Sequence, residues 1–277
     1  MTLSDRNNIF RAGIALSFLC LLLCITASIK AIPVYPLMEK EITLRSEGIL
    51  QIFAGNLFNV RLLSVHCSII VLVLYSSLTI ILNYYFFEKT KSPEILFVVF
   101  FAASFSLEAL RLILPLGLVY DFPSLYLLVA SRVILFGRLF GIFSLFTASI
   151  YGAGYEMQRQ RYVIVIITVI SLLIAMGIPI DTQTWDSGLN MVTGYTTMFR
   201  LIDIGTFLIT AISFFIAAWS RGSRGYVFIG LGSVLVFLGR NILLNADTWA
   251  SLPAGLPLLA VGTWLICTNI HKIYLWL

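Results

Sequence analysis

The chain has 277 residues, of which 60% are hydrophobic and 11% are charged. Soluble domains contain roughly 45–50% apolar and about 25% charged residues, so this composition excludes a water-soluble globule. Apolar runs of about 20 residues recur from one end of the chain to the other, which is the pattern of a polytopic helical membrane protein. The formal net charge of +5 is interpreted as a topology signal, and no nucleic-acid partner is expected.

Eight segments are long enough to cross a bilayer as α-helices. They cover residues 10–32, 62–87, 95–118, 124–153, 162–180, 201–219, 226–245 and 253–273. The predicted fold class is therefore all-α, with residues 1–277 forming one membrane domain, a bundle of eight transmembrane helices. The first segment follows Arg6 and Arg11, as in a secretory signal, but its apolar run is long for a signal peptide. We therefore expect this segment to stay in the bundle.

With eight spans, most basic residues near the segment ends collect on one side. That side carries Arg6, Arg11, Lys89, Lys91, Arg159, Arg161, Arg221, Arg224 and Lys272 against Asp5, Glu88, Glu94 and Glu156. An excess of Lys and Arg marks the cytoplasmic side of a membrane protein. The chain is therefore predicted to lie in the cell inner membrane with both termini in the cytoplasm.

One long connection, residues 33–61, lies on the opposite, outer side. Apolar residues recur there at near-helical spacing among polar ones: Ile42, Ile49, Leu50, Phe53 and Leu57. This spacing predicts a short helix on the outer membrane face, which either plugs the top of the bundle or covers a ligand. The other connections are short, except for residues 181–199.

Ionisable residues inside the predicted spans are Glu108, Arg111, Arg132, Arg138, Arg200, Asp203 and Arg240. A charge at the bilayer centre costs roughly 2.5–3.5 kcal/mol on an insertion scale. These side chains must therefore pair, reach the interface or line a wet cavity. Because successive helices alternate in direction, all of them except Arg138 fall in the outer half, and Arg138 falls near the midplane.

Small residues repeat on the seventh segment. Gly225, Gly232 and Gly239 recur every seven residues, beside Arg240 and Asn241. Glycines on one face allow a neighbouring membrane helix to approach closely. We expect such a contact here.

The intramembrane charges support two hypotheses. Five arginines against Glu108 and Asp203 leave a surplus of positive charge. Guanidinium groups suit carboxylates and phosphates, so the first hypothesis is an outward-facing pocket for an anionic small molecule or a lipid headgroup. Its ligand-binding residues would be Glu108, Arg111, Arg132, Arg138, Arg200, Asp203, Arg240 and Asn241. The alternative is that Glu108–Arg111 and Arg200–Asp203 are local structural pairs, with the other arginines reaching lipid phosphates.

Residue patterns for metal, redox or catalytic chemistry are not found in the sequence. His66 and His271 fall at opposite membrane faces, so they cannot ligate one haem. The four cysteines form no CxxC pair and no Cys/His cluster, and no phosphate-binding glycine loop occurs. We therefore expect no cofactor, no metal site and no enzymatic activity.

The layout resembles the multi-helix membrane input modules that precede output domains in bacterial sensor kinases and diguanylate cyclases. The resemblance covers the whole chain and rests on its eight short-looped spans, its arginine-bearing outer half (Glu108-Ala109-Leu110-Arg111, Arg132, Arg240-Asn241) and a last segment that ends as His271 to Leu277. It implies a sensory or interaction module with two packings that differ in ligand affinity. Because the sequence stops at Leu277, we expect the signal to pass through a protein partner or a homo-oligomer.

Two other functions fit the same residues. A carrier or flippase would use the arginines to line a path for an anionic solute or lipid, but transporters usually show internal repeats and midplane sites. An accessory subunit of a membrane complex would bury its polar faces against another protein. The concentration of polar residues in the outer half favours sensing over transport. Membrane lipids are expected partners for each of the three functions.

Overall fold

The computed structural model describes residues 3–32, 35, 62–87, 92–154, 160–246 and 248–275. The helix predicted between residues 42 and 57 lies outside these residues. The helices are α1 (Leu3–Ala31), α3 (Leu62–Phe87), α4 (Pro93–Ser104), the 3-10 helix η4 (Phe105–Leu112), α5 (Ile113–Tyr120), α6 (Ser124–Gly152), α7 (Gln160–Gly177), α8 (Thr196–Arg221), α9 (Arg224–Leu244) and α10 (Ser251–Leu275).

Eight helical segments among the described residues are long and apolar enough to cross a membrane, with residues 93–117 counted as one. This confirms the predicted helical bundle. The bounds differ most at three ends, one of which is the start of α8, at Thr196 instead of residue 201. Helix α1 already begins at Leu3, before the predicted residue 10, so it contains Arg6 and Arg11. Helix α7 ends at Gly177 instead of residue 180 because a strand begins at Ile180.

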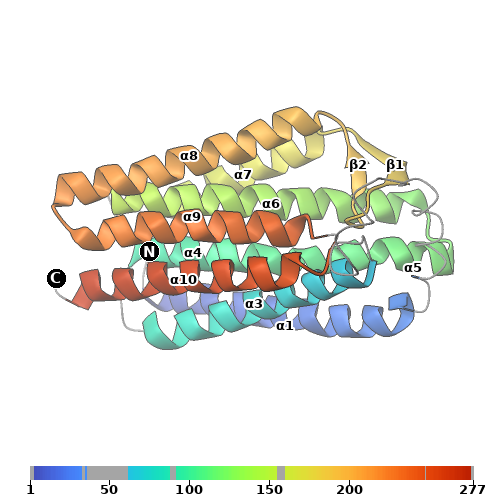
Figure 1. The fold of residues 1–277 in the computed structure, drawn as a ribbon, viewed down its shortest axis with the longest axis horizontal. Coiled ribbons are helices and arrows are strands. Elements are labelled where there is room, and N and C mark those ends of the chain that lie inside the picture. The colour runs from blue at the N-terminus through green and yellow to red at the C-terminus, as the bar shows by residue number, and fades with distance from the viewer. Residues whose placement is uncertain are drawn as a thin grey trace.

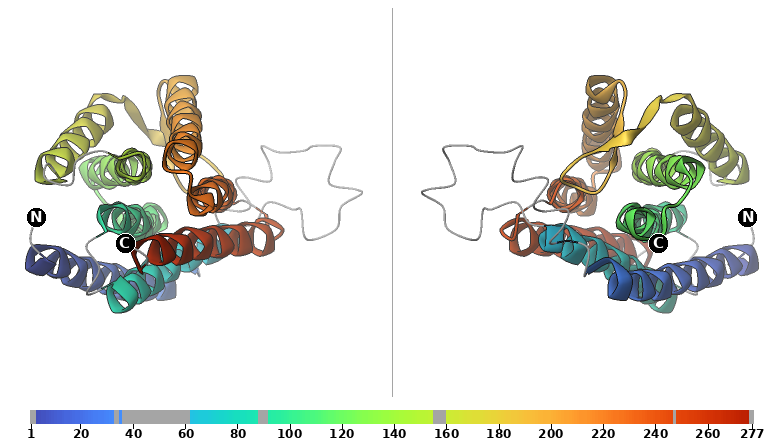
Figure 2. Two further views of the ribbon diagram at one scale, coloured as in Figure 1. Left: turned by 90° about the vertical axis from the view of Figure 1, so that its left-hand side faces the viewer. Right: turned by 90° about the vertical axis from the view of Figure 1, so that its right-hand side faces the viewer.

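The centre of the bundle is the pair formed by α6 and the segment from α4 to α5 (Figure 1). In residues 93–117, 78% of the apolar window is buried, against 17% in α7 and in α8. Helices α1 and α3 lie on one side of this pair, and α7 and α8 lie on the other (Figure 2). The peripheral helices therefore keep a broad apolar face turned outward, as helices surrounded by lipid do.

Helices α9 and α10 approach each other through glycine. A Cβ atom on Gly232 would lie 2.9 Å from the carbonyl oxygen of Gly262, and one on Gly239 would lie 2.6 Å from the backbone nitrogen of Leu259. Only residues without a Cβ allow two backbones to come this close. The predicted glycine contact is therefore confirmed for Gly232 and Gly239, and the partner is α10.

A β-hairpin follows α7, which the all-α prediction did not include. Strand β1 (Ile180–Trp185) pairs antiparallel with β2 (Met191–Thr193), and Ile180 lies opposite Thr193. Both strands are so short that their residue pattern is much weaker than that of the long apolar runs, and the hairpin was therefore not predicted. The hairpin lies at the end of the bundle opposite to the two chain termini (Figure 1).

Candidate functional site

The polar cluster begins in η4, where the central segment tightens from an α-helix to a 3-10 helix. With three residues per turn, side chains three apart lie above one another. Arg111 Nη1 is accordingly 3.5 Å from Glu108 Oε2, and both residues are buried. The predicted local pair Glu108–Arg111 is confirmed.

Arg138 lies in the middle of α6 and binds the same carboxylate, that of Glu108. Its Nε donates to Glu108 Oε1 at 2.7 Å, and its Nη2 donates to Glu108 Oε2 at 2.8 Å. Gly137 and Gly141 let α6 approach α4 and η4 closely, because a Cβ on Gly137 would lie 2.9 Å from Leu107 Cδ1 and one on Gly141 would clash with Ser104 Oγ. The result is a two-pronged guanidinium–carboxylate pair inside the bundle.

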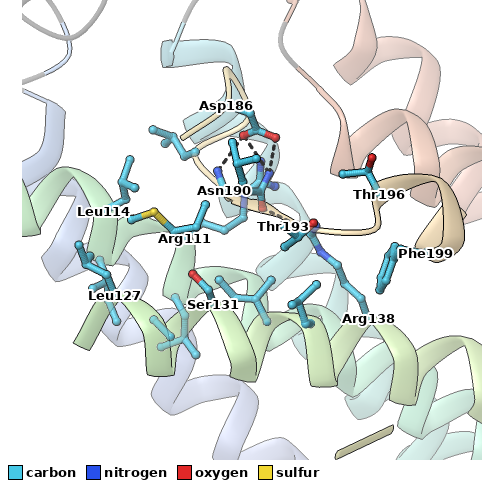
Figure 3. A pocket seen from close by; sticks show the side chains of 18 of the residues that line it. Arg111, Leu114, Leu127, Ser131, Arg138, Asp186, Asn190, Thr193, Thr196 and Phe199 are labelled. Atoms are coloured by element: carbon cyan, nitrogen blue, oxygen red, sulfur yellow. Dashed lines mark hydrogen bonds between the residues drawn. The ribbon is translucent and has the colours of Figure 1, made fainter. Parts of the chain in front are cut away.

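The turn of the β-hairpin is attached to both arginines (Figure 3). Arg138 Nη2 donates to Asn190 Oδ1 at 2.8 Å, and Arg111 Nη2 donates to the carbonyl oxygen of Gly188. The turn is held internally by Asp186, whose Oδ1 accepts from the backbone nitrogen of Asn190 at 2.9 Å. The same two arginines therefore hold the core helices together and fix the hairpin over them.

Arg240, on α9, extends the cluster toward α8. Its Nη1 donates to Asp203 Oδ1 at 2.9 Å and to Asn241 Oδ1 at 3.2 Å. Its Nη2 reaches the backbone carbonyl of Arg138 at 3.5 Å. Asp203 thus pairs across two helices, and the predicted Arg200–Asp203 pair is wrong.

Two arginines predicted for the pocket lie elsewhere. Arg132 Nη1 donates to the carbonyl oxygens of Ala175, at 3.2 Å, and Met176, which are free acceptors because α7 ends there. Arg200 is exposed near the start of α8, and no ion pair joins it to another residue in the described part of the chain. Neither residue contributes to the buried cluster.

The charge of the cluster also differs from the predicted surplus. Arg111, Arg138 and Arg240 are accompanied by Glu108 and Asp203, and by Asp186 from the hairpin turn. The turn brings Asp186 close, since a Cβ on Gly188 would lie 3.0 Å from Arg111 Nη2 and 3.3 Å from Asp186 Oδ1. Glu108 and Asp203 form ion pairs with the three cations, and Asp186, which accepts from Asn190, adds a third negative charge nearby, so the cluster is formally neutral.

A cavity of about 340 Å³ lies beneath the hairpin, between the end of the central segment, α6 and the start of α8 (Figure 3). Its polar lining combines helix and hairpin side chains: Arg111, Ser131, Arg138, Asp186, Asn190, Thr193, Thr196 and Asn245. Of the predicted ligand-binding residues, only Arg111 and Arg138 line it. Glu108 pairs with both of them, whereas Asp203, Arg240 and Asn241 are not among its lining residues.

Two guanidinium nitrogens on the cavity's arginines keep free hydrogen-bonding capacity. Arg138 has a side chain that is 16% exposed, and its Nη1 has no hydrogen-bond partner among the described residues. Arg111 Nε is buried and likewise has no partner within the described ranges. An unsatisfied buried donor such as Arg111 Nε is costly, and the partly exposed Arg138 Nη1 is open to the cavity, so both nitrogens can donate to a guest that offers oxygen acceptors.

The residues missed by sequence reasoning are those of the hairpin turn, Asp186, Gly188 and Asn190. The signal was present: an Asp-Ser-Gly turn lies between two short runs rich in β-branched residues. A search for groups of His, Cys, Asp and Glu that could hold a metal ion finds none in the described part of the chain.

Comparison of the chain with models of protein families gives no match, and comparison with curated proteins gives none either.

Proposed function

We propose that this chain is a multi-pass membrane module that binds a small oxygen-bearing anion in the cavity beneath the β-hairpin. The observation that carries the proposal is Nη1 of Arg138 in the cavity wall, which has no hydrogen-bond partner among the described residues. A guanidinium edge of this kind recognises carboxylate or phosphate oxygens. Because the cluster is formally neutral, each negative charge on a ligand is left uncompensated, so the favoured ligand carries only one, as a carboxylate or a phosphodiester does.

The attachment of the hairpin favours a sensory role for this module. Arg138 binds Glu108 in the core and Asn190 in the hairpin through the same Nη2 atom. A ligand oxygen that competes for this guanidinium would change how firmly the hairpin is held, which gives two states with different ligand affinity. Transmission of that change would use a protein partner or a second copy of the chain.

A carrier or flippase is the second candidate. It would need a polar path from the cavity to the end of the bundle where the termini lie. Below the cluster the core is instead packed with aromatic rings, such as Phe101 and Phe105, whose centroids are 4.9 Å apart. The same packing gives no support to a catalytic step, and none is proposed. The accessory-subunit alternative requires a stoichiometric protein partner.

The test of ligand binding is a native mass spectrum of gently purified protein. We expect a retained monoanion in the wild type and its loss in Arg138→Ala, with affinity lower by about tenfold to a hundredfold. Arg221→Ala is the matched control, because Arg221 lies at the other end of α8 and contacts Tyr226. Ser131→Leu would fill the cavity without touching the ion pairs, so it should also lose the ligand.

Equal retention in wild type, Arg138→Ala and Ser131→Leu would remove the cavity as the binding site. A chain that retains no anion but co-purifies with a stoichiometric protein would instead favour the accessory-subunit function. If a ligand is found, flux measurements in liposomes separate carrier from sensor, since only a carrier moves the bound anion across the bilayer.

We further propose that the termini lie on the cytoplasmic side of a cell inner membrane, because the basic residues concentrate at that end. Reporter fusions at Leu277 and at Ser187, between the two strands, should then report opposite sides of the membrane. Fusions reporting the same side would contradict the eight-span arrangement.

A further inference from the structure

A second cavity lies on the side of the bundle, between α3 and α10. It has a volume of about 720 Å³ and is lined on α3 by Leu74, Leu78 and Leu82 and on α10 by Ala260 and Trp264. It is far along both helices from the hairpin turn and shares no lining residue with the cavity beneath the hairpin. We call it the lateral groove.

The lateral groove follows from the packing of α10. The glycine seam draws α10 against α9, which leaves its opposite flank only lightly joined to α3. Two polar contacts connect α3 and α10 along the groove: Tyr75 Oη lies 3.1 Å from Thr263 Oγ1, and Cys267 Sγ lies 3.3 Å from Asn83 Oδ1. These contacts keep the two helices side by side while the space between them stays open.

The walls of the lateral groove are apolar and accessible. Trp264 is 64% exposed, Leu78 is 59% exposed and Leu82 is 54% exposed. Exposed apolar side chains also cover the outward faces of the other peripheral helices, so in a bilayer these walls would lie against acyl chains. The groove runs along α3 from Val71 to Phe87, about 24 Å at 1.5 Å per residue, so it extends over more than one leaflet's hydrocarbon depth of about 15 Å.

The two ends of the lateral groove differ in charge. The end of the groove farther from the chain termini is lined by apolar residues, Val71 on α3 and Leu256 on α10. At the end near the chain termini, Lys272 lines the groove and is exposed. Arg6 stands at the same end, since its Nη2 donates to the carbonyl oxygen of Phe87 at 2.6 Å. An apolar channel that ends at the exposed cation Lys272, with the buried Arg6 nearby, is complementary to an acyl chain with an anionic headgroup.

We propose that the lateral groove binds one anionic phospholipid. An acyl chain lies along Leu78 and Trp264, and the phosphate lies beside Lys272. Basic pockets between membrane helices on the cytoplasmic side are used in this way for anionic headgroups. The proposal requires the chain to lie in a bilayer, but it is independent of the ligand beneath the hairpin.

The probe is phosphatidylglycerol, compared with phosphatidylcholine of the same chains. Full-length protein in mild detergent is titrated with each lipid and the bound molecules are counted by native mass spectrometry. We expect one tightly bound phosphatidylglycerol in the wild type and about fivefold weaker binding in Lys272→Gln, because one cation near a headgroup is removed. Arg224→Gln, at the same end of the bundle but outside the groove lining, is the matched control and should leave binding unchanged.

A second variant tests the groove itself. Ala260→Trp fills the groove without changing charge and should abolish the tight site, whereas Ile212→Trp on the exposed face of α8 should not. In liposomes, brominated phosphatidylglycerol should quench Trp264 more strongly than brominated phosphatidylcholine. Size-exclusion profiles of all variants check that the bundle is folded.

Three results would overturn the proposal: equal binding of the two lipids, an Ala260→Trp variant that keeps the tight site, or a Lys272→Gln variant indistinguishable from Arg224→Gln. A change in oligomeric mass in Ala260→Trp without a change in bound lipid would assign the groove to a second copy of the chain. Loss of the ligand beneath the hairpin, with lipid binding intact, would affect only the proposed function.

Discussion

Replacement of Glu108 by Gln should lower the free energy of unfolding by about 3–5 kcal/mol, the cost of breaking a buried ion pair by removing one partner. Glu108 is 2% exposed and accepts both prongs of Arg138 while also facing Arg111. Glutamine keeps the size of the side chain but removes the negative charge, so two guanidinium groups lose their shared buried counter-charge. The measurement is reversible unfolding in mixed micelles, followed by tryptophan fluorescence.

The control for this change is a single-contact ion pair at the surface. Asp5 Oδ2 is 2.5 Å from Arg161 Nη2, but the two side chains are 40% and 69% exposed. Asp5→Asn should therefore cost at most about 1 kcal/mol. The double variant Glu108→Gln, Arg138→Gln should regain part of the lost stability, because it removes one of the two orphaned charges. A Glu108→Gln variant as stable as Asp5→Asn would contradict the buried network.

Gly239→Ala should destabilise the protein by about 1–3 kcal/mol, as expected when an extra carbon is forced into a packed contact. A Cβ at this position would lie 2.6 Å from the backbone nitrogen of Leu259 and 2.8 Å from the backbone oxygen of Gly255. Both atoms belong to the α10 backbone, so α10 itself has to move. The matched control is Gly205→Ala on α8, where nothing lies within 4 Å of the added carbon.

Gly205→Ala should raise stability by about 0.5–1 kcal/mol through helix propensity alone, so the two identical changes are expected to have opposite signs. The same unfolding measurement checks both. A Gly239→Ala variant that is also stabilised would show that α9 and α10 are not in backbone contact.

Local properties of the sequence were enough to predict the helical framework. Whether a segment can cross a bilayer depends on the length and polarity of one continuous run, as for residues 62–87, which coincide with α3. The pair Glu108–Arg111 and the glycine contact of Gly232 and Gly239 could also be predicted from the sequence, because both depend on the spacing of residues along one helix. The position of Arg138 in the middle of its helix followed from counting residues.

The candidate site was only partly predictable because its decisive contacts join different elements. Asp203 lies three residues from Arg200, yet it pairs with Arg240, since the neighbouring helix presents a nearer and more buried cation. Arg132 lies six residues from Arg138 on α6 but reaches the open carbonyls at the end of α7. Spacing along a chain does not fix which neighbour a side chain will meet.

The sequence by itself determined which segments form the apolar helices and which charged residues lie within them, because hydrophobic length and helical spacing are local quantities. Only the tertiary structure decided the chemistry of the site. It brought Asp186 and Asn190 from a short hairpin over Arg111 and Arg138 and neutralised the apparent surplus of charge. It also left Nη1 of Arg138 facing a cavity without a partner among the described residues. The physical reason is that ion pairing inside a bundle depends on distance and burial in three dimensions. A buried charge is stabilised by the nearest buried opposite charge, wherever that residue lies in the sequence.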